Sequence, residues 1–455
     1  MTETAVKTTE SGEAWVQNWL ENFTEFEKKA AGQSLSWLRR LREDAFARFC
    51  ETGFPTTRDE DWRFTNVAAI ARTAFRPAGA AKLTATEVAQ YAVQGAAATL
   101  VFVNGRYAAE LSQTANLPKG VTVASLREQI EQHPETLEKH LGRYADIQRD
   151  SFCALNAAFM SDGAYVHVAR GVALDGPVAL LYLTTAEEGA TMTQPRNLIV
   201  AEDQSQVAVV EDYASVGGES VAFSNAVTEL VAGESAVAEH FLIEREHTKA
   251  FNVQTLRIQQ ARSANVSSHS VLLGGALVRN NVHPVLAGEG GECLINGLFI
   301  GTGRQHLDNF MHVEHASPHC GSRQFYNGIL DGQAHGVFHG RIVVHPEAQK
   351  TDAKQTNRNL LLSDDAQIDT KPQLEIYADD VKCTHGATIG QIEENALFYL
   401  QSRGISEAEA RKLLLMAFAD ECVERMQSGA AREHAKKLVG QQLVLLGSTA
   451  RGESA

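Results

Sequence analysis

The sequence predicts an α+β, mainly β fold in which a long β core lies between two segments that contain helices. Between about Gly163 and His385, short β-branched runs are separated by Gly, Asp, Asn and Ser, with almost no helical periodicity. More than 200 residues of short strands require a large all-β arrangement, which is a sandwich, a barrel or a solenoid of stacked coils. No repeat length separates these three, but short runs with small and Asn/Asp turn residues favour a coiled parallel β-helix.

The change from helical to β-rich patterning and back along the chain predicts three domains. A chain of 455 residues is longer than one hydrophobic core usually serves. We predict an N-terminal helical and mixed α/β domain over residues 1–145, a parallel β-helix core over residues 146–387 and a C-terminal helical domain over residues 388–455.

The N-terminal domain begins with helical spacing. Trp19, Phe23 and Phe26 recur at steps of four and three. This stripe predicts a helix face that packs on its own domain. Further along, Asn104-Gly105 stands between apolar runs. This dipeptide is a strong hairpin signal, because a type I′ turn needs positive φ at both central residues.

Helical signals return after Gly386. Thr388-Ile389-Gly390-Gln391 resembles a capping box, which predicts a helix that starts there and ends at Arg403-Gly404. Ser406-Glu407-Ala408-Glu409 is a second capping box and predicts the start of another helix. A third helix is predicted over about residues 430–446. Three short helices have little core of their own, so we expect them to pack on the β region, on a partner, or on both.

Composition excludes several classes of protein. The formal charge is −15, from 41 basic and 56 acidic residues, and phosphate backbones need a basic surface, so we expect no nucleic-acid partner. No apolar run approaches the length that spans a bilayer, and the N-terminus lacks the pattern of a signal peptide. Six cysteines without a Cys-x-x-Cys pair indicate reduced thiols in a cytoplasm rather than a disulfide framework.

Familiar catalytic motifs are missing from the sequence. No Gly-Lys dipeptide occurs, so there is no P-loop, and neither His-Glu-x-x-His nor Gly-x-Ser-x-Gly is present. A chain of this size without such a constellation is interpreted as a scaffold, or as a subunit that works with others.

Cys383 and His385 are the candidate metal ligands. Residues two apart in a strand point to the same face, so this thiolate and this imidazole converge. Sulfur and imidazole nitrogen together suit iron, zinc or copper(I). Two ligands do not complete a site, so further ligands are expected from a partner chain. Asp379 and Asp380 precede the pair, and carboxylates accept hydrogen bonds from ligating imidazoles. The competing interpretation is a buried small thiol and a surface histidine.

A second group of histidines is concentrated between residues 304 and 345. Its spacing His312-x-x-His315-x-x-x-His319-Cys320 is like that of metal ligands. The steps mix odd and even numbers, which scatters the side chains over both faces of a strand. We therefore expect structural or solvent-facing roles for its seven members: His306, His312, His315, His319, His335, His339 and His345.

Long blocks of the chain resemble the SufB/SufD family of scaffold subunits for iron–sulfur cluster assembly. These blocks are Val344–Ser363, Pro372–Gly390, Leu397–Ile405 and the loop Asp61-Trp62-Arg63-Phe64-Thr65. The resemblance is densest between about residues 303 and 419, and the order of domains agrees over the whole chain. The sequence Cys-Thr-His-Gly-Ala-Thr at residues 383–388 resembles the SufD branch more than the paralogous SufB branch.

The resemblance implies a right-handed parallel β-helix and a complex with SufB and the ABC-type ATPase SufC. It implies that the β-helix ends of SufB and SufD pair and that a transient iron–sulfur cluster forms at their junction. His385, with Cys383, falls on the family's ligand element, and SufB supplies further thiolate or carboxylate. The residues that match the SufC-docking region are Phe398, Tyr399, Arg403 and Gly404.

The same resemblance implies a cytoplasmic subunit without turnover of its own, since the ATPase activity belongs to SufC. Isolated chains are expected to form homodimers, and flavin binding has no support in the sequence. Two alternatives remain besides a SufB-type paralogue. A carbohydrate-active β-helix enzyme would need a catalytic groove and usually a secretion signal, and a β-helical acyltransferase would need a clear hexapeptide repeat.

Overall fold

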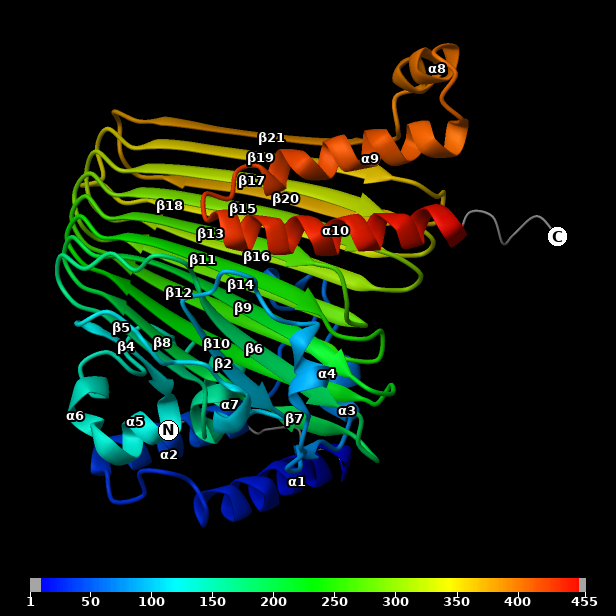
Figure 1. Ribbon diagram of the computed structural model, residues 1–455. Helices are drawn as coiled ribbons and strands as arrows, with labels where there is room; N and C mark the ends of the chain where they lie inside the picture. The colour runs from blue at the N-terminus through cyan, green and yellow to red at the C-terminus, as the bar shows by residue number, and fades with distance from the viewer. Residues whose placement is uncertain (1–9, 450–455) are drawn as a thin grey trace.

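Two long β-sheets, built almost entirely from parallel strands, form the body of the molecule (Figure 1). The structure is a computed structural model that describes residues 10–449, with side chains described for residues 17–446. From edge to edge, the first sheet contains β20 (Gln367–Ile376), β18 (His335–Val344), β16 (His306–His315), β14 (Leu277–Leu286), β12 (Phe251–Gln260), β10 (Ala222–Ala232), β8 (Arg196–Ala201), β5 (Ala164–Val168) and β4 (Val121–Ser125). The short strands β1 (Arg76–Pro77) and β7 (Thr191–Thr193) join it beside β10.

The second sheet takes the alternate strands. It contains, in order, β21 (Lys382–Gly390), β19 (Asp352–Leu361), β17 (Gly321–Leu330), β15 (Glu292–Gly301), β13 (Asn265–Leu272), β11 (Val237–Arg245), β9 (Gln206–Val216), β6 (Val178–Thr185), β2 (Ala98–Val103) and β3 (Arg106–Tyr107). Each coil of the chain therefore adds one strand to each sheet, which is the architecture of a β-solenoid. The predicted parallel β-helix is confirmed.

Successive coils differ in length. Ser268 pairs with Ile295, an offset of 27 residues, whereas Gln324 pairs with Gln355, an offset of 31 residues. The strands themselves stay in register, so the difference is absorbed by the turns. This variation in coil length explains why no repeat length is visible in the sequence.

The interior of the solenoid is the largest core. Along each strand, alternate side chains point inward and stack on their equivalents in the coils above and below, about 4.8 Å away. Inward residues such as Val266, Phe299 and Phe338 are fully buried and belong to one continuous cluster. Where helices cover the outer face, as over β6 (VALLYLTT), the strand is apolar on both sides, whereas β16 (HLDNFMHVEH) largely alternates apolar inward residues with polar outward residues.

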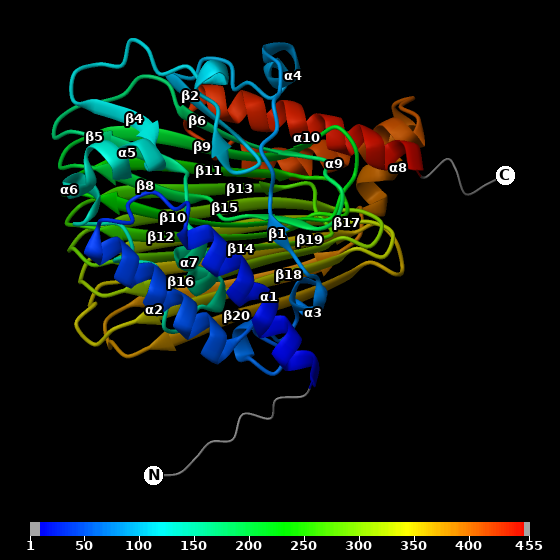
Figure 2. The same cartoon turned by 90° about the horizontal axis from the view of Figure 1, so that it is seen from below.

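Most of the N-terminal segment covers the outer face of the first sheet, whereas its helix Ala85–Ala89 packs on the second sheet (Figures 1 and 2). Its helices are α1 (Glu10–Glu27), α2 (Ser36–Thr52), α3 (Ala68–Arg72), α4 (Ala85–Ala89), α5 (Leu126–Gln132), α6 (Pro134–Leu137) and α7 (Ser151–Phe159), with short 3₁₀ turns at Glu60–Trp62 and Ala109–Leu111. The predicted aromatic stripe is confirmed as a packing face, since Trp19 lies 5.5 Å from Phe49 and Phe23 stacks 4.1 Å from Phe46 between ring centroids.

The predicted Asn104-Gly105 hairpin is also confirmed. Phe102 pairs with Tyr107 and Val103 with Arg106 in antiparallel register. Asn104 and Gly105 have φ of 51° and 72°, as a type I′ turn requires. Since β2 pairs with β6, the N-terminal segment continues the second sheet as well as covering the first.

Three C-terminal helices, α8 (Glu394–Ser402), α9 (Glu407–Val423) and α10 (Gly429–Thr449), follow the last coil. The capping box at Ser406 and Glu409 is confirmed, because each side chain bonds the other's backbone N–H. The capping box predicted at Thr388 is wrong. Residues 388–390 continue β21 in pairing with β19, and α8 begins after Glu393 without a side-chain cap. Backbone hydrogen bonds to β19 stabilise residues 388–390 as a strand more than their local sequence stabilises a helix.

α9 and α10 pack on the outer face of the second sheet. Asn296 Nδ2 donates to the carbonyl of Cys422 at 2.8 Å, and Asn327 Nδ2 donates to the carbonyl of Phe418 at 2.8 Å. The expectation that these helices need the β region for a core is met, since α9 and α10 share one apolar cluster with outward residues of the strands.

A buried ion-pair network, called the ionic clasp below, attaches α10 to the second sheet. Arg245 donates to both oxygens of Asp212, at 2.9 and 2.7 Å, and His434 of α10 contacts the same carboxylate at 2.9 Å. Burial by itself would raise the pKa of Asp212, but the hydrogen bonds from His434 and Arg245 outweigh it and hold the pKa below its ordinary value.

Candidate functional site

The last coil of the solenoid is an open end. β21 pairs with β19 on one side and is the terminal strand of its sheet, and β20 is the terminal strand of the other sheet. In Figure 1 both strands lie at the end opposite the N-terminal helices. A terminal strand presents unpaired backbone N–H and C=O groups, which are a template for pairing with another chain.

Cys383 and His385 lie on this terminal strand and share its inward face. Their ladder partners on β19 are Ala353 and Gln355, both of which are buried inside the solenoid. The Cα atoms of two residues at this spacing are about 6.6 Å apart. Cys383 is half-buried and packs against the main core, whereas His385 is exposed. The structure thus places the two side chains over the interior column at the open end.

Burial favours the protonated form of the Cys383 thiol. Burial raises its pKa above the ordinary value near 9.0, although a hydrogen bond with the backbone of Ala353 acts in the opposite direction. A bound cation favours the thiolate, so metal binding here would release a proton.

No hydrogen bond or ion pair joins His385 to Asp379 or Asp380 among the described residues, and the support of a metal-bound imidazole by these carboxylates stays a prediction. Asp380 forms an ion pair with Lys350, and its backbone N–H donates to Gln349 Oε1 at 2.9 Å. These contacts hold the turn between β20 and β21 against the preceding coil. The carboxylate is therefore engaged elsewhere, and the side chain stacked below His385 is an amide, Gln355.

Gln355 is a residue that sequence reasoning missed. Its side chain is buried, and neither amide atom has a hydrogen-bond partner among the described residues. Gln324, the next member of the same inward column, is in the same state. No signal in the sequence could identify this column, because it joins residues about 30 positions apart and the coil length varies.

Exposed apolar side chains surround the open end. Tyr377, which follows β20, is 63% exposed, and Ile376 and Ile389 are also exposed. Large apolar groups exposed together on a sheet edge are typical of interaction surfaces.

α8 stands away from the body and has no buried residue (Figure 1). Phe398 is 72% and Tyr399 57% exposed. The Arg403 guanidinium lies 5.2 Å over the Tyr399 ring, and Gly404, with φ of 87°, ends the helix in a conformation that favours glycine. The four predicted partner-binding residues therefore form one exposed surface.

α9 connects α8 to the coil beside the open end. Arg358 of β19 forms an ion pair with Glu421 of α9, and its guanidinium lies 5.3 Å over Phe418. β19 is the strand on which β21 pairs. A displacement of α8 and α9 would thus act on the strand directly under Cys383 and His385.

The histidines between residues 304 and 345 lie apart from this site. His306 bonds Thr65 at 2.9 Å under the Asp61–Thr65 loop, and His315 bonds Ser322 at 2.8 Å inside the solenoid. Burial lowers the pKa of His306, His315 and His339 to about 4, so these imidazoles are neutral. Over the described residues, no group of three or more His, Cys, Asp or Glu side chains is arranged to hold a metal ion. The observed contacts of His306 and His315 stabilise the fold.

The Asp61–Thr65 loop lies over His306 and the strands beside it. Trp62 covers the buried Arg279 guanidinium at 4.2 Å, and Arg341 donates to Asp61 at 2.9 Å. Glu60 and Lys371 extend the contact to β20. Through these contacts the loop joins the N-terminal segment to the last coils of the solenoid.

None of the helices between residues 10 and 449 combines the length and apolar character that crossing a membrane demands.

Comparison with known proteins gives a consistent result. The family model described as "SUF system FeS cluster assembly, SufBD core domain" matches residues 182–418, and that of the "SufBD protein N-terminal region" matches residues 13–180. An iron–sulfur cluster assembly SufBD family protein of Synechocystis sp. is 35% identical, over 87% of this chain and 89% of its own length. The iron–sulfur cluster assembly protein SufD of Escherichia coli is 31% identical, over 94% and 96%. SufD of Bacillus subtilis is 26% identical, over 88% and 92%.

Proposed function

This chain belongs to the SufBD family of iron–sulfur cluster assembly proteins, and we propose that it is a non-catalytic scaffold subunit of the SufD type. In this role it contributes Cys383 and His385 to a nascent cluster that it shares with a SufB partner. The observation that carries the proposal is that both side chains lie on one face of the terminal strand.

The chemistry of the pair supports assembly and release rather than storage. Thiolate and imidazole are both ligands for iron, and imidazole is the ligand that protonation displaces near neutral pH. Two ligands do not complete an iron site, and no group of three or more His, Cys, Asp or Glu side chains among the described residues is arranged to hold a metal, which supports completion by a second chain. Cluster content then depends on the assembled complex.

The open end supports pairing with SufB. β20 and β21 present unpaired strand edges, and Tyr377, Ile376 and Ile389 add apolar surface beside them. A partner with the same solenoid end would continue both sheets across the junction. The same surface supports homodimers of the isolated chain.

Docking of SufC is proposed for the exposed surface of Phe398, Tyr399, Arg403 and Gly404 on α8. Movement of the ATPase subunits would reach β19 through α9 and its contacts with Asn327 and Arg358. The six cysteines, all free, fit a reducing cytoplasm, which is the compartment that we propose.

Anaerobic reconstitution of the co-purified complex tests the ligand assignment. His385→Ala and Cys383→Ser are each compared with Thr384→Ala, which changes the outward-facing residue between them. We expect iron and acid-labile sulfide to fall below half of the wild-type content in the two ligand variants and to stay unchanged in the control. Gel filtration should show the same complex for all four proteins. Equal cluster content in His385→Ala and Thr384→Ala contradicts the proposal.

A further inference from the structure

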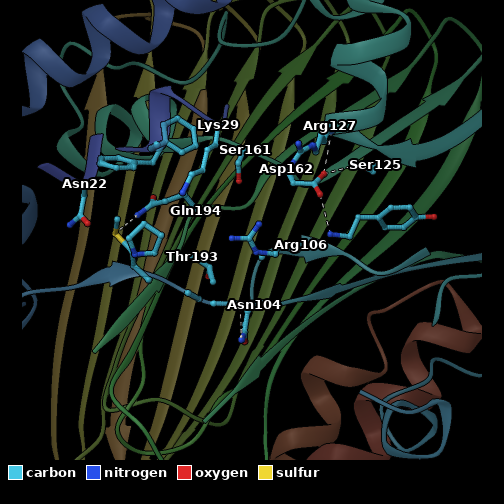
Figure 3. A pocket seen from close by; sticks show the side chains of 18 of the residues that line it. Asn22, Lys29, Asn104, Arg106, Ser125, Arg127, Ser161, Asp162, Thr193 and Gln194 are labelled. Carbon is cyan, nitrogen blue, oxygen red and sulfur yellow. Dashed lines mark hydrogen bonds between the residues drawn. The ribbon is translucent and has the colours of Figure 1, made fainter. Parts of the chain in front are cut away.

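A cavity of about 840 Å³ lies at the end of the solenoid opposite Cys383. It is enclosed by α1, the Asn104-Gly105 hairpin, the start of α5 and the chain around β7 (Figure 3). The volume is within the range of about 300–1,000 Å³ that small-molecule sites occupy. Neither the proposed cluster site nor the α8 surface includes any of its residues.

One wall of the cavity is apolar. Phe26 and Phe159 lie 5.5 Å apart between ring centroids, and Met192 and Pro77 complete this wall. Phe159 and Met192 are buried parts of the core between the N-terminal helices and the first sheet. Phe26 and Pro77 are the more exposed members of this wall, which suits a flat apolar group.

Arg106 stands in the middle of the cavity, between Gln194 on one side and Asp162 on the other (Figure 3). Its backbone is held on both sides. The Asn104 amide donates to Gly79 O, Thr185 Oγ1 and Glu187 Oε1, and the Tyr107 N–H donates to Asp162 at 3.0 Å. The hairpin thus presents Arg106 on a fixed base.

The Arg106 side chain is exposed to solvent and forms no ion pair with the described acids of the cavity. Among side chains of residues 17–446 it makes no hydrogen bond or ion pair, and the same holds for Lys29 on the opposite rim. Arg127, the third cation of the cavity, is engaged by Glu131 at 3.2 Å. Free cations on two sides of a cavity attract an anion, and a guanidinium presents paired donors to a carboxylate or phosphate.

The acids of the cavity do not neutralise these cations. Glu25 lines the cavity beside Lys29, but its ion pair is with Lys28, which does not line the cavity. Asp162 at the floor accepts hydrogen bonds from Ser125 Oγ at 2.7 Å and from three backbone N–H groups, and burial raises its pKa. Glu128 at the rim and Asp162 at the floor both lack an ion-pair partner, but the donors around Asp162 already occupy its carboxylate, so Arg106 keeps its hydrogen-bond donors available to a ligand.

We propose that this cavity binds a small organic anion that carries an aromatic part. The ring lies against Phe26, Phe159 and Met192, and the charged group, a phosphate or a carboxylate, binds Arg106 with Lys29. The inference does not rest on the cluster-assembly function, because the cavity and the open end are at opposite ends of the solenoid.

Fluorescence titration of the full chain with 8-anilinonaphthalene-1-sulfonate, an aromatic anion, tests the proposal. N-phenyl-1-naphthylamine is the matched neutral probe. We expect Arg106→Gln to raise the dissociation constant of the anionic probe at least fivefold and to leave that of the neutral probe unchanged. Arg262→Gln removes an exposed arginine from a solenoid turn and should change neither. Because Arg106 has no side-chain partner, its variant should unfold at the same urea concentration as the wild type.

Displacement distinguishes the two anion chemistries. If 1-naphthyl phosphate displaces the probe at lower concentration than 1-naphthoate, the site takes a phosphate ester, and the reverse order assigns a carboxylate. Equal affinity of wild type and Arg106→Gln for the anionic probe, or equal weakening of both probes, overturns the proposal. Failure of both naphthyl anions to displace it has the same consequence.

Discussion

His385 lies directly above Gln355 in the ladder of β19 and β21, so the exposed imidazole of the last coil stacks on a buried amide. Both amide atoms of Gln355 lack partners among the described residues. A buried polar group without a partner costs about 1–3 kcal/mol, and a hydrogen bond to the Gln355 amide would recover part of this cost. A ligating imidazole gains from a hydrogen-bond partner that fixes its ring, and the amide is in place to become that partner.

Gln355→Leu should therefore separate stability from cluster binding. We expect the free energy of unfolding in urea to be equal to wild type or higher by up to about 2 kcal/mol, since an unpaired amide is replaced by a side chain of similar volume. The reconstituted complex should hold less iron. Ala353→Val, at the neighbouring inward position, controls for altered packing near the strand. A large loss of stability in Gln355→Leu would contradict this account.

Alkylation of Cys383 should depend on pH and on the SufB partner. Because burial raises the thiol pKa above 9.0, the thiolate fraction is small at pH 7.5 and increases about tenfold per pH unit until the pKa is reached. Iodoacetamide labelling followed by peptide mass spectrometry should show this increase in the isolated chain. In the complex with SufB, labelling of Cys383 should be suppressed.

Cys50 is the matched control for that experiment. It is also half-buried, and burial also raises its pKa, but it lies on α2 at the other end of the molecule. Its labelling should follow pH in the same way and be indifferent to SufB. Equal labelling of Cys383 in the free chain and in the complex would place the junction elsewhere.

Asp212→Asn should loosen α10 and destabilise the chain. The carboxylate is buried and serves both Arg245 and His434, so its loss leaves two polar side chains poorly paired, at a cost of about 3–5 kcal/mol. Its pKa is lowered in the folded state, so its contribution is present at neutral pH and is lost as pH falls through the folded pKa.

Urea unfolding at pH 7 measures this loss, and Glu219→Gln is the control. Glu219 pairs with Lys249 at the surface, where such a pair contributes about 0–1 kcal/mol. At a pH below the folded pKa of Asp212, the difference between wild type and Asp212→Asn should shrink. A difference that stays constant with pH would show that the clasp acts through packing alone.

Phe398→Ala should weaken binding of SufC without affecting the fold. The ring is largely exposed and α8 has no buried residue, so truncation removes no core contact. An exposed aromatic anchor typically contributes 2 kcal/mol or more at an interface, which is about a thirtyfold change in the dissociation constant. Val444→Ala, which removes an exposed apolar group from α10, should leave SufC affinity unchanged in biosensor measurements.

Local signals in the sequence predicted local structure well. The Asn104-Gly105 hairpin and the capping box at Ser406 each depend on a few adjacent residues, and both are present. The capping box expected at Thr388 failed because β19 offers residues 388–390 a complete ladder, which no local pattern reveals. The ion pair of Asp380 with Lys350, one coil away, is likewise a contact that no local pattern reveals.

The amino-acid order alone determined that a β core lies between helical ends and that Cys383 and His385 share a strand face, because alternation along a strand is a property of the backbone. Only the folded chain decided that this strand is the last of its sheet and that Gln355 lies under His385. It also decided that Arg106 faces a cavity without an ion-pair partner among its described acids. These relationships join residues from different coils, and the offset between coils is set by turns of varying length. Contacts of that kind arise from the register of the ladders, which is settled by burial across the whole solenoid.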